Sequence, residues 1–117
     1  MFLRLEIQYI KEDKLLKFNI TEEIDHHTTE KMRRRMDYEI QRHMPRKVVF
    51  DFNCVVFMDS AGIGMIIGRY KLTSMLGGTM EICNIKPNIK KVLEMSGIHK
   101  IIKLYEEGEE EKNAKLI

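Results

Sequence analysis

Residues 57–70, FMDSAGIGMIIGRY, constrain the fold of this 117-residue chain more than any other segment. They follow the apolar run at 48–50, so a buried strand is expected to lead through a short loop into a helix. Asp59 and Ser60 are both helix-capping residue types, and Ser60 is expected to cap a helix that starts at Ala61.

Three glycines lie inside this predicted helix, at Gly62, Gly64 and Gly68. Each glycine weakens a helix by roughly 1 kcal/mol relative to alanine, so the three glycines need a compensating interaction. The pattern indicates that something approaches the helix closely. The sheet, a ligand or another protein could each fill that role.

Alternation of apolar and polar residues, together with short apolar runs, predicts the other elements. Strands are expected at residues 3–9, 16–20, 48–50, 79–85 and 101–104. Helices are expected from Asp25 to Pro45, from Ala61 to Gly77 and from Pro87 to Gly97. This order predicts an α/β fold with a mostly parallel five-stranded sheet, an antiparallel first strand and three to four helices. Ser60 then follows a central strand at its carboxyl end, where such sheets often place ligand sites.

Length and composition indicate a single domain over residues 1–117, with residues 106–117 forming an acidic tail or a loosely packed last turn. The net charge of +2 does not mark a dedicated nucleic-acid binder. No apolar run is long enough to cross a bilayer and no signal peptide is apparent, so a cytoplasmic protein without direct membrane or nucleic-acid contact is expected.

A basic cluster on the first predicted helix and just beyond its final proline is interpreted as a solvated face, because no aromatic side chains interleave with it to stack bases. Its members are Arg33, Arg34, Arg35, Arg42, Arg46 and Lys47. The chain has no GxSxG turn and its four histidines are scattered, so neither an enzyme nor a metal or cofactor site is predicted.

A small nucleotide-binding domain is an alternative, because Gly62, Gly64 and Gly68 open a helix and Glu81 lies at a suitable distance to hold a ribose. The third glycine comes one residue late for the dinucleotide pattern, and Asp59 would oppose a pyrophosphate.

Phosphorylation of Ser60 is a third possibility, because a phosphate there would lie at the positive end of a helix dipole. Ala61 leaves Ser60 as the only hydroxyl in the turn. Periodicity and capping alone do not separate this role from that of an ordinary helix cap.

Four segments, at 57–64, 24–28, 68–71 and 95–98, resemble the anti-sigma factor antagonists of the STAS-domain family. The resemblance covers nearly the whole chain and is closest to the sporulation branch, the SpoIIAA proteins of spore-forming bacteria. It implies a non-enzymatic switch. The unphosphorylated protein would bind an anti-sigma factor that is also a serine kinase, SpoIIAB-like and carrying ATP or ADP, and so release the sporulation sigma factor sigma-F.

The resemblance further implies that this kinase phosphorylates Ser60 and that a PP2C-type phosphatase, SpoIIE-like, reverses the modification. A general-stress antagonist remains an alternative within the family. The partner-binding surface is expected to contain Asp25, Asp59, Ser60, Ala61, Gly62, Gly64 and Met65.

Two positions depart from the family pattern. Ala61 stands where relatives often have Ser or Thr, which favours Ser60 as the acceptor. Glu22 stands where relatives usually have Gly, so the pose of the loop that carries Asp25 is not specified.

Overall fold

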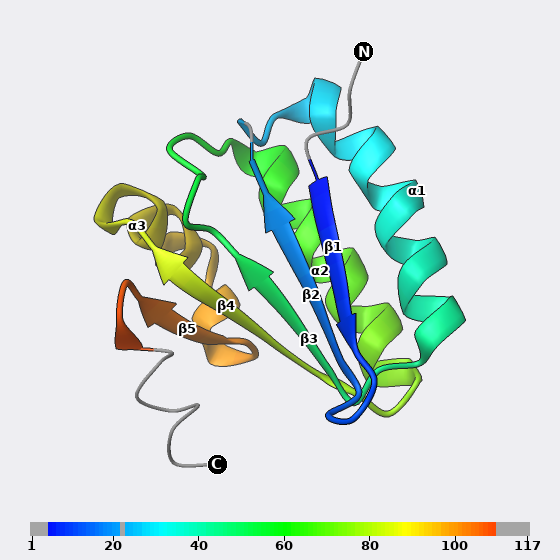
Figure 1. Cartoon of the computed structure of the whole chain (residues 1–117). Coiled ribbons are helices and arrows are strands. Elements are labelled where there is room, and N and C mark those ends of the chain that lie inside the picture. The colour runs from blue at the N-terminus through cyan, green and yellow to red at the C-terminus, as the bar shows by residue number, and fades with distance from the viewer. Residues whose placement is uncertain (1–4, 22, 110–117) are drawn as a thin grey trace.

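A single β-sheet carries all of the described helices on one of its faces in the computed structural model, which describes residues 5–21 and 23–109 (Figure 1). The strands are β1 (Leu5–Ile10), β2 (Leu15–Ile20), β3 (Lys47–Asp51), β4 (Thr79–Ile85) and β5 (Lys103–Glu106). The helices are α1 (His26–His43), α2 (Ser60–Met75) and α3 (Pro87–Ser96), with a 3₁₀ turn, η1, at Ile98–Lys100.

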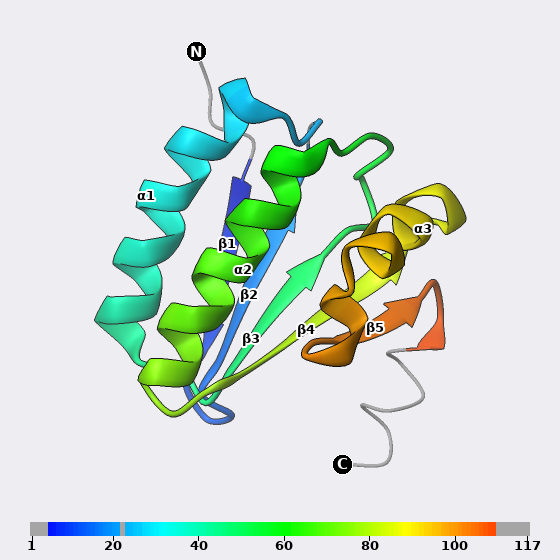
Figure 2. The same cartoon turned by 180° about the vertical axis from the view of Figure 1, so that it is seen from behind.

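The sheet has the order β1-β2-β3-β4-β5, with β1 antiparallel to β2 and the remaining neighbours parallel. The predicted fold class is confirmed. Each parallel connection steps the same way along the sheet, and right-handed crossovers of this kind place their helices on one face. Figure 2 shows α1, α2 and α3 in front of the sheet when it is viewed from behind.

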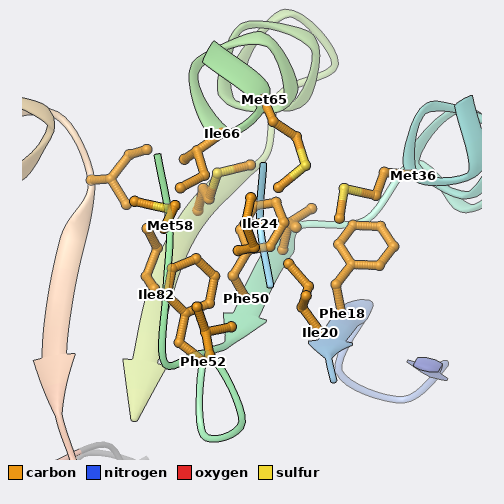
Figure 3. Close-up of a cluster of buried hydrophobic side chains, with 14 of the residues drawn as sticks. Phe18, Ile20, Ile24, Met36, Phe50, Phe52, Met58, Met65, Ile66 and Ile82 are labelled. Carbon is orange, nitrogen blue, oxygen red and sulfur yellow. The ribbon is translucent and has the colours of Figure 1, made fainter. Parts of the chain in front are cut away.

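Strand alternation decides which side chains meet the helices. In β2, Leu16, Phe18 and Ile20 are fully buried, and Phe18 lies beside Phe50 of β3, with their ring centroids 5.6 Å apart. Ile82 of β4 continues this row. Figure 3 shows Phe18, Ile20, Phe50 and Ile82 within the cluster of buried side chains.

The opposite face of the sheet carries charge pairs. Lys17 Nζ lies 3.4 Å from Asp51 Oδ2, and Lys47 Nζ lies 3.3 Å from Glu81 Oε2. Glu81 is therefore near the start of β4 and on the face away from the helices, whereas a ribose-binding carboxylate is needed at the carboxyl ends of the strands. This placement removes the main support for the dinucleotide alternative.

Several predicted boundaries differ from the structure. The last strand begins at Lys103 rather than Ile101, because Ile101 and Ile102 form the turn after η1. Ser60 is the first residue of α2, and Asp59 is its cap. Leu3 of the predicted first strand, Glu22 and residues 110–117 of the predicted tail lie outside the described residues.

Gly62 confirms the expected close approach to the glycine-bearing helix. A Cβ at this position would overlap Met58 and would lie 2.9 Å from Ile24 Cγ2. At Gly68 no heavy atom of the described residues, apart from its chain neighbours and the nearby backbone of α2, lies within 4 Å of the corresponding position, so packing against described residues does not account for that glycine. Alanine substitutions at Gly62 and Gly68 therefore compare a closely packed position with an open position in the same helix.

We predict that Gly62→Ala destabilises the protein by about 1 to 3 kcal/mol, because the added methyl overpacks Met58 and Ile24. Gly68→Ala should stabilise it by up to about 1 kcal/mol through helix propensity. Urea unfolding of both variants measures the difference. Equal effects at the two positions would contradict the packing explanation.

Candidate functional site

Helices α1 and α2 begin side by side at the carboxyl ends of the central strands. An isolated parallel bridge joins Ile24 to Met58, just before each helix starts. The Ile24 backbone N–H donates to the Phe57 carbonyl (3.2 Å), and the Asp59 N–H donates to the Ile24 carbonyl (3.0 Å). Because Asp25 and Asp59 directly follow the bridged residues, two helix-capping aspartates are held next to each other, with both helices starting at the same end in Figure 2.

Asp25 is the N-cap of α1, as predicted. Its Oδ1 accepts from the backbone N–H groups of His27 (2.9 Å) and Thr28 (3.1 Å), and Thr28 Oγ1 accepts in return from the Asp25 N–H. The bond from Thr28 is the largest influence on the carboxyl and lowers its pKa below the ordinary 3.8, against a smaller opposing effect of burial. The carboxylate is thus fixed in position and in its charged form at neutral pH.

Asp59 caps α2 in place of Ser60, and its Oδ1 accepts from the Ala61 N–H at 2.9 Å. Ser60 is exposed, and its hydroxyl makes no hydrogen bond with any of the described residues. Since the capping role belongs to Asp59, the Ser60 hydroxyl is not engaged in holding the helix end. The structure therefore assigns the capping role to Asp59, whereas capping preference alone did not decide whether Ser60 is a helix cap.

Met65 and Gly62 do not belong to an exposed surface, contrary to the sequence-based prediction. Met65 is fully buried and points into the core near Ile24 (Figure 3), and Gly62 packs against Met58. The remaining predicted positions are accessible to different degrees. Ser60 and Gly64 are exposed, and Asp25, Asp59 and Ala61 are half-buried.

The loop before α2 presents apolar side chains that sequence reasoning missed. Val56 is 59% exposed and Phe57 is 47% exposed, although they follow a buried strand and Val55 is fully buried. Asn88 Nδ2 at the start of α3 donates to the Val56 carbonyl (3.1 Å), which ties this loop to the neighbouring helix. Large apolar side chains that remain exposed beside polar groups are typical of protein-binding surfaces.

An ion pair between Asp37 of α1 and Arg69 of α2 joins the two helices further along their length. Arg69 Nε lies 2.8 Å from Asp37 Oδ1, and Arg69 Nη2 donates to Asp37 Oδ2 at 3.3 Å. The short Nε contact is an ion pair whose angle falls outside hydrogen-bond geometry. Burial is the main effect that lowers the pKa of Arg69, and Asp37 opposes it.

Three of the four arginines of the basic cluster that lie on α1 form ion pairs within the helix. Arg34 pairs with Glu30 (2.9 Å), and Arg35 and Arg42 both lie 3.6 Å from the buried carboxylate of Glu39. Helical pairs of this kind are typical of a solvated face.

Comparison with known proteins agrees with this architecture. The STAS domain profile matches residues 6–111. The anti-sigma F factor antagonist of Paenibacillus polymyxa is 38% identical over 104 residues, which are 89% of each chain. The chain belongs to the STAS-domain family of anti-sigma factor antagonists.

Two solved structures of this family share the fold. SpoIIAA in its unphosphorylated form has a TM-score of 0.78 at 23% identity and covers 97% of each chain. SpoIIAA in its phosphorylated form, described as a Bacillus cell fate determinant, has a TM-score of 0.71 at 23% identity, over 97% of this chain and 99% of that one. In the described part of the STAS chain, no helix has the length and apolar character needed to span a membrane.

We predict that the charge of Asp25 stabilises the native protein above the carboxyl's unfolded pKa and that this contribution disappears as the pH falls through its lower folded pKa. Asp25→Asn keeps a capping oxygen and removes the charge. The difference in unfolding free energy between the two proteins should therefore be full near about pH 5 and should shrink towards about pH 2. Urea titrations across that range measure it, and a difference independent of pH would contradict this role for the carboxylate.

Proposed function

We propose that this chain is an anti-sigma factor antagonist whose binding is switched by phosphorylation of Ser60. The observation that carries the proposal is the Ser60 hydroxyl. It is exposed, without a hydrogen-bond partner among the described residues, and it lies at the N-terminus of α2 beside the Asp25 cap. The 38% identity to an anti-sigma F factor antagonist supports the sporulation branch, with sigma-F as the factor released.

The unphosphorylated protein binds an anti-sigma factor that is also a serine kinase, and this binding removes the anti-sigma factor from its sigma factor. The kinase transfers the γ-phosphoryl group of ATP to Ser60 Oγ, with release of ADP and of the hydroxyl proton. A PP2C-type phosphatase then hydrolyses the phosphoester with water and restores the serine. The chain itself acts as a cytoplasmic binding partner and substrate, without catalytic residues of its own.

The local geometry favours Ser60 over other hydroxyls. Thr28 Oγ1 is held in the α1 capping box and donates to the Glu23 carbonyl, and Thr73 is 1% exposed. The backbone N–H groups at the start of α2 and the helix dipole favour an added anion, so the modification should leave α2 intact. Relatives of the same fold with and without phosphate support this expectation.

Phosphorylation would prevent binding through charge and solvation. The phosphate adds about −1.5 to −2 charges at neutral pH next to the carboxylates of Asp59 and Asp25. A closely packed interface would strip water from this charge, and an unpaired buried charge is strongly unfavourable. The modified surface should therefore release its partner.

We predict that the anti-sigma factor kinase of the same organism, supplied with ATP, adds one phosphate, on Ser60. Intact mass should rise by a single phosphate, and Ser60→Ala should remain unmodified while it still binds the kinase. Ser74 is exposed on α2 and serves as the control position, so Ser74→Ala should be modified normally. A peptide map that places the phosphate on Ser74 or Thr28 would overturn the assignment.

We predict that Phe57 is an anchor of the binding surface. Loss of an aromatic side chain that is buried in an interface often costs about 2 kcal/mol or more of binding free energy. Phe57→Glu should therefore weaken kinase binding by about thirtyfold or more. Met75 is 78% exposed at the far end of α2, so Met75→Glu is the matched control and should bind normally. Calorimetric titration of both variants measures the effect, and equal affinities would place the surface elsewhere.

A further inference from the structure

Arg33 of α1 reaches the face of α2 that carries Ser60. Its Nη2 atom lies 3.5 Å from the position that a Cβ would take at Gly64. Gly64 follows Ser60 by four residues in the same helix, and positions with that spacing lie on one face with Cβ atoms about 5 to 6 Å apart. The Arg33 guanidinium therefore lies about one helical turn from the Ser60 side chain.

Gly64 leaves the path between the two side chains open. It is exposed, and it has no side chain that would stand between Arg33 and Ser60. Arg33 is also exposed, so its long side chain can change rotamer to follow a group attached at Ser60.

The charge of Arg33 is not neutralised within the described part of the chain. Its neighbour Arg34 pairs with Glu30 at 2.9 Å, whereas Arg33 forms neither an ion pair nor a hydrogen bond with a described residue. Arg69 is close enough for the positive charge of Arg33 to lower its pKa, but Arg69 is committed to Asp37. Two guanidinium groups and one carboxylate thus lie where α1 meets α2, and Arg33 is the cation among them that has no ion-pair partner in the described part of the chain.

We propose that Arg33 of α1 binds the phosphate of phosphorylated Ser60 at the start of α2. The proposal rests on the proposed function, in which Ser60 is the modified residue. A planar guanidinium can donate two hydrogen bonds to one phosphate, and the N–H groups at the start of α2 can supply further donors. Arg33 would offset the repulsion from Asp59 and Asp25 and hold the modified side chain against α1.

This role gives Arg33 a measurable effect on the phosphate itself. A nearby cation favours the dianion, so Arg33 should lower the second pKa of the phosphate from its usual value of about 6. Asp59 and Asp25 act in the opposite direction, and His26 and His27 are the other titratable side chains in the first turn of α1. These four groups are unchanged in the variants that test the proposal.

The test uses the full chain with phosphoserine installed at position 60 during translation, so that neither kinase nor phosphatase is needed. A ³¹P NMR titration follows the second pKa of the phosphate. Arg33→Gln should raise this pKa by about half a unit or more, and Arg33→Lys should restore part of the shift because it keeps the charge. Arg34→Gln removes the same charge from the adjacent residue and should leave the pKa unchanged.

Equal shifts in Arg33→Gln and Arg34→Gln would show a general field effect and would overturn the contact, as would the absence of a shift in Arg33→Gln. Circular dichroism of each variant verifies that α1 and α2 remain folded. Because the phosphate is installed without the kinase, a negative titration refutes the role of Arg33 alone. Failure of the kinase to modify Ser60 would refute the proposed function and leave this titration unaffected.

Discussion

The parallel bridge between Ile24 and Met58 is the contact on which the candidate site depends. It joins two loops that are distant in the sequence and sets the starts of α1 and α2 next to each other. Both bridged side chains are buried, and Gly62 allows the first turn of α2 to pack directly on them. The starts of α1 and α2, where Asp25 and Ser60 lie, are thus attached to the hydrophobic core, which fixes the shape of the surface around these two residues.

This attachment is compatible with the proposed switch, in which a single side chain is phosphorylated and the fold is kept. The capping hydrogen bonds are made by Asp25 and Asp59, which leaves Ser60 outside the interactions that hold the helices. In the proposed switch, a charge added at Ser60 would change what the surface binds without removing a structural contact. Because Asp59 and not Ser60 caps α2, stability and binding could then be changed independently.

Much of the fold could be predicted from the sequence because its strands and two of its helices have clear periods. Alternation in β2 and the apolar stripe of α1 identified the buried faces, and Pro87 and Gly97 bound α3. Helix α2 is apolar on most sides, so its period did not reveal that Met65 faces the core. The preference of both Asp and Ser for cap positions likewise could not decide between Asp59 and Ser60, which only the backbone geometry resolves.

The most direct test of the phosphorylation switch compares the unmodified protein with the protein phosphorylated at Ser60, using calorimetric titration with the anti-sigma factor and thermal melting of each form. We expect the phosphorylated form to bind about a hundredfold more weakly or worse, because loss of several kcal/mol corresponds to at least that change in affinity. Its melting temperature and helix content should match those of the unmodified protein. Equal affinities would contradict the switch, and a phosphorylated form that melts much earlier would show that it acts by unfolding instead.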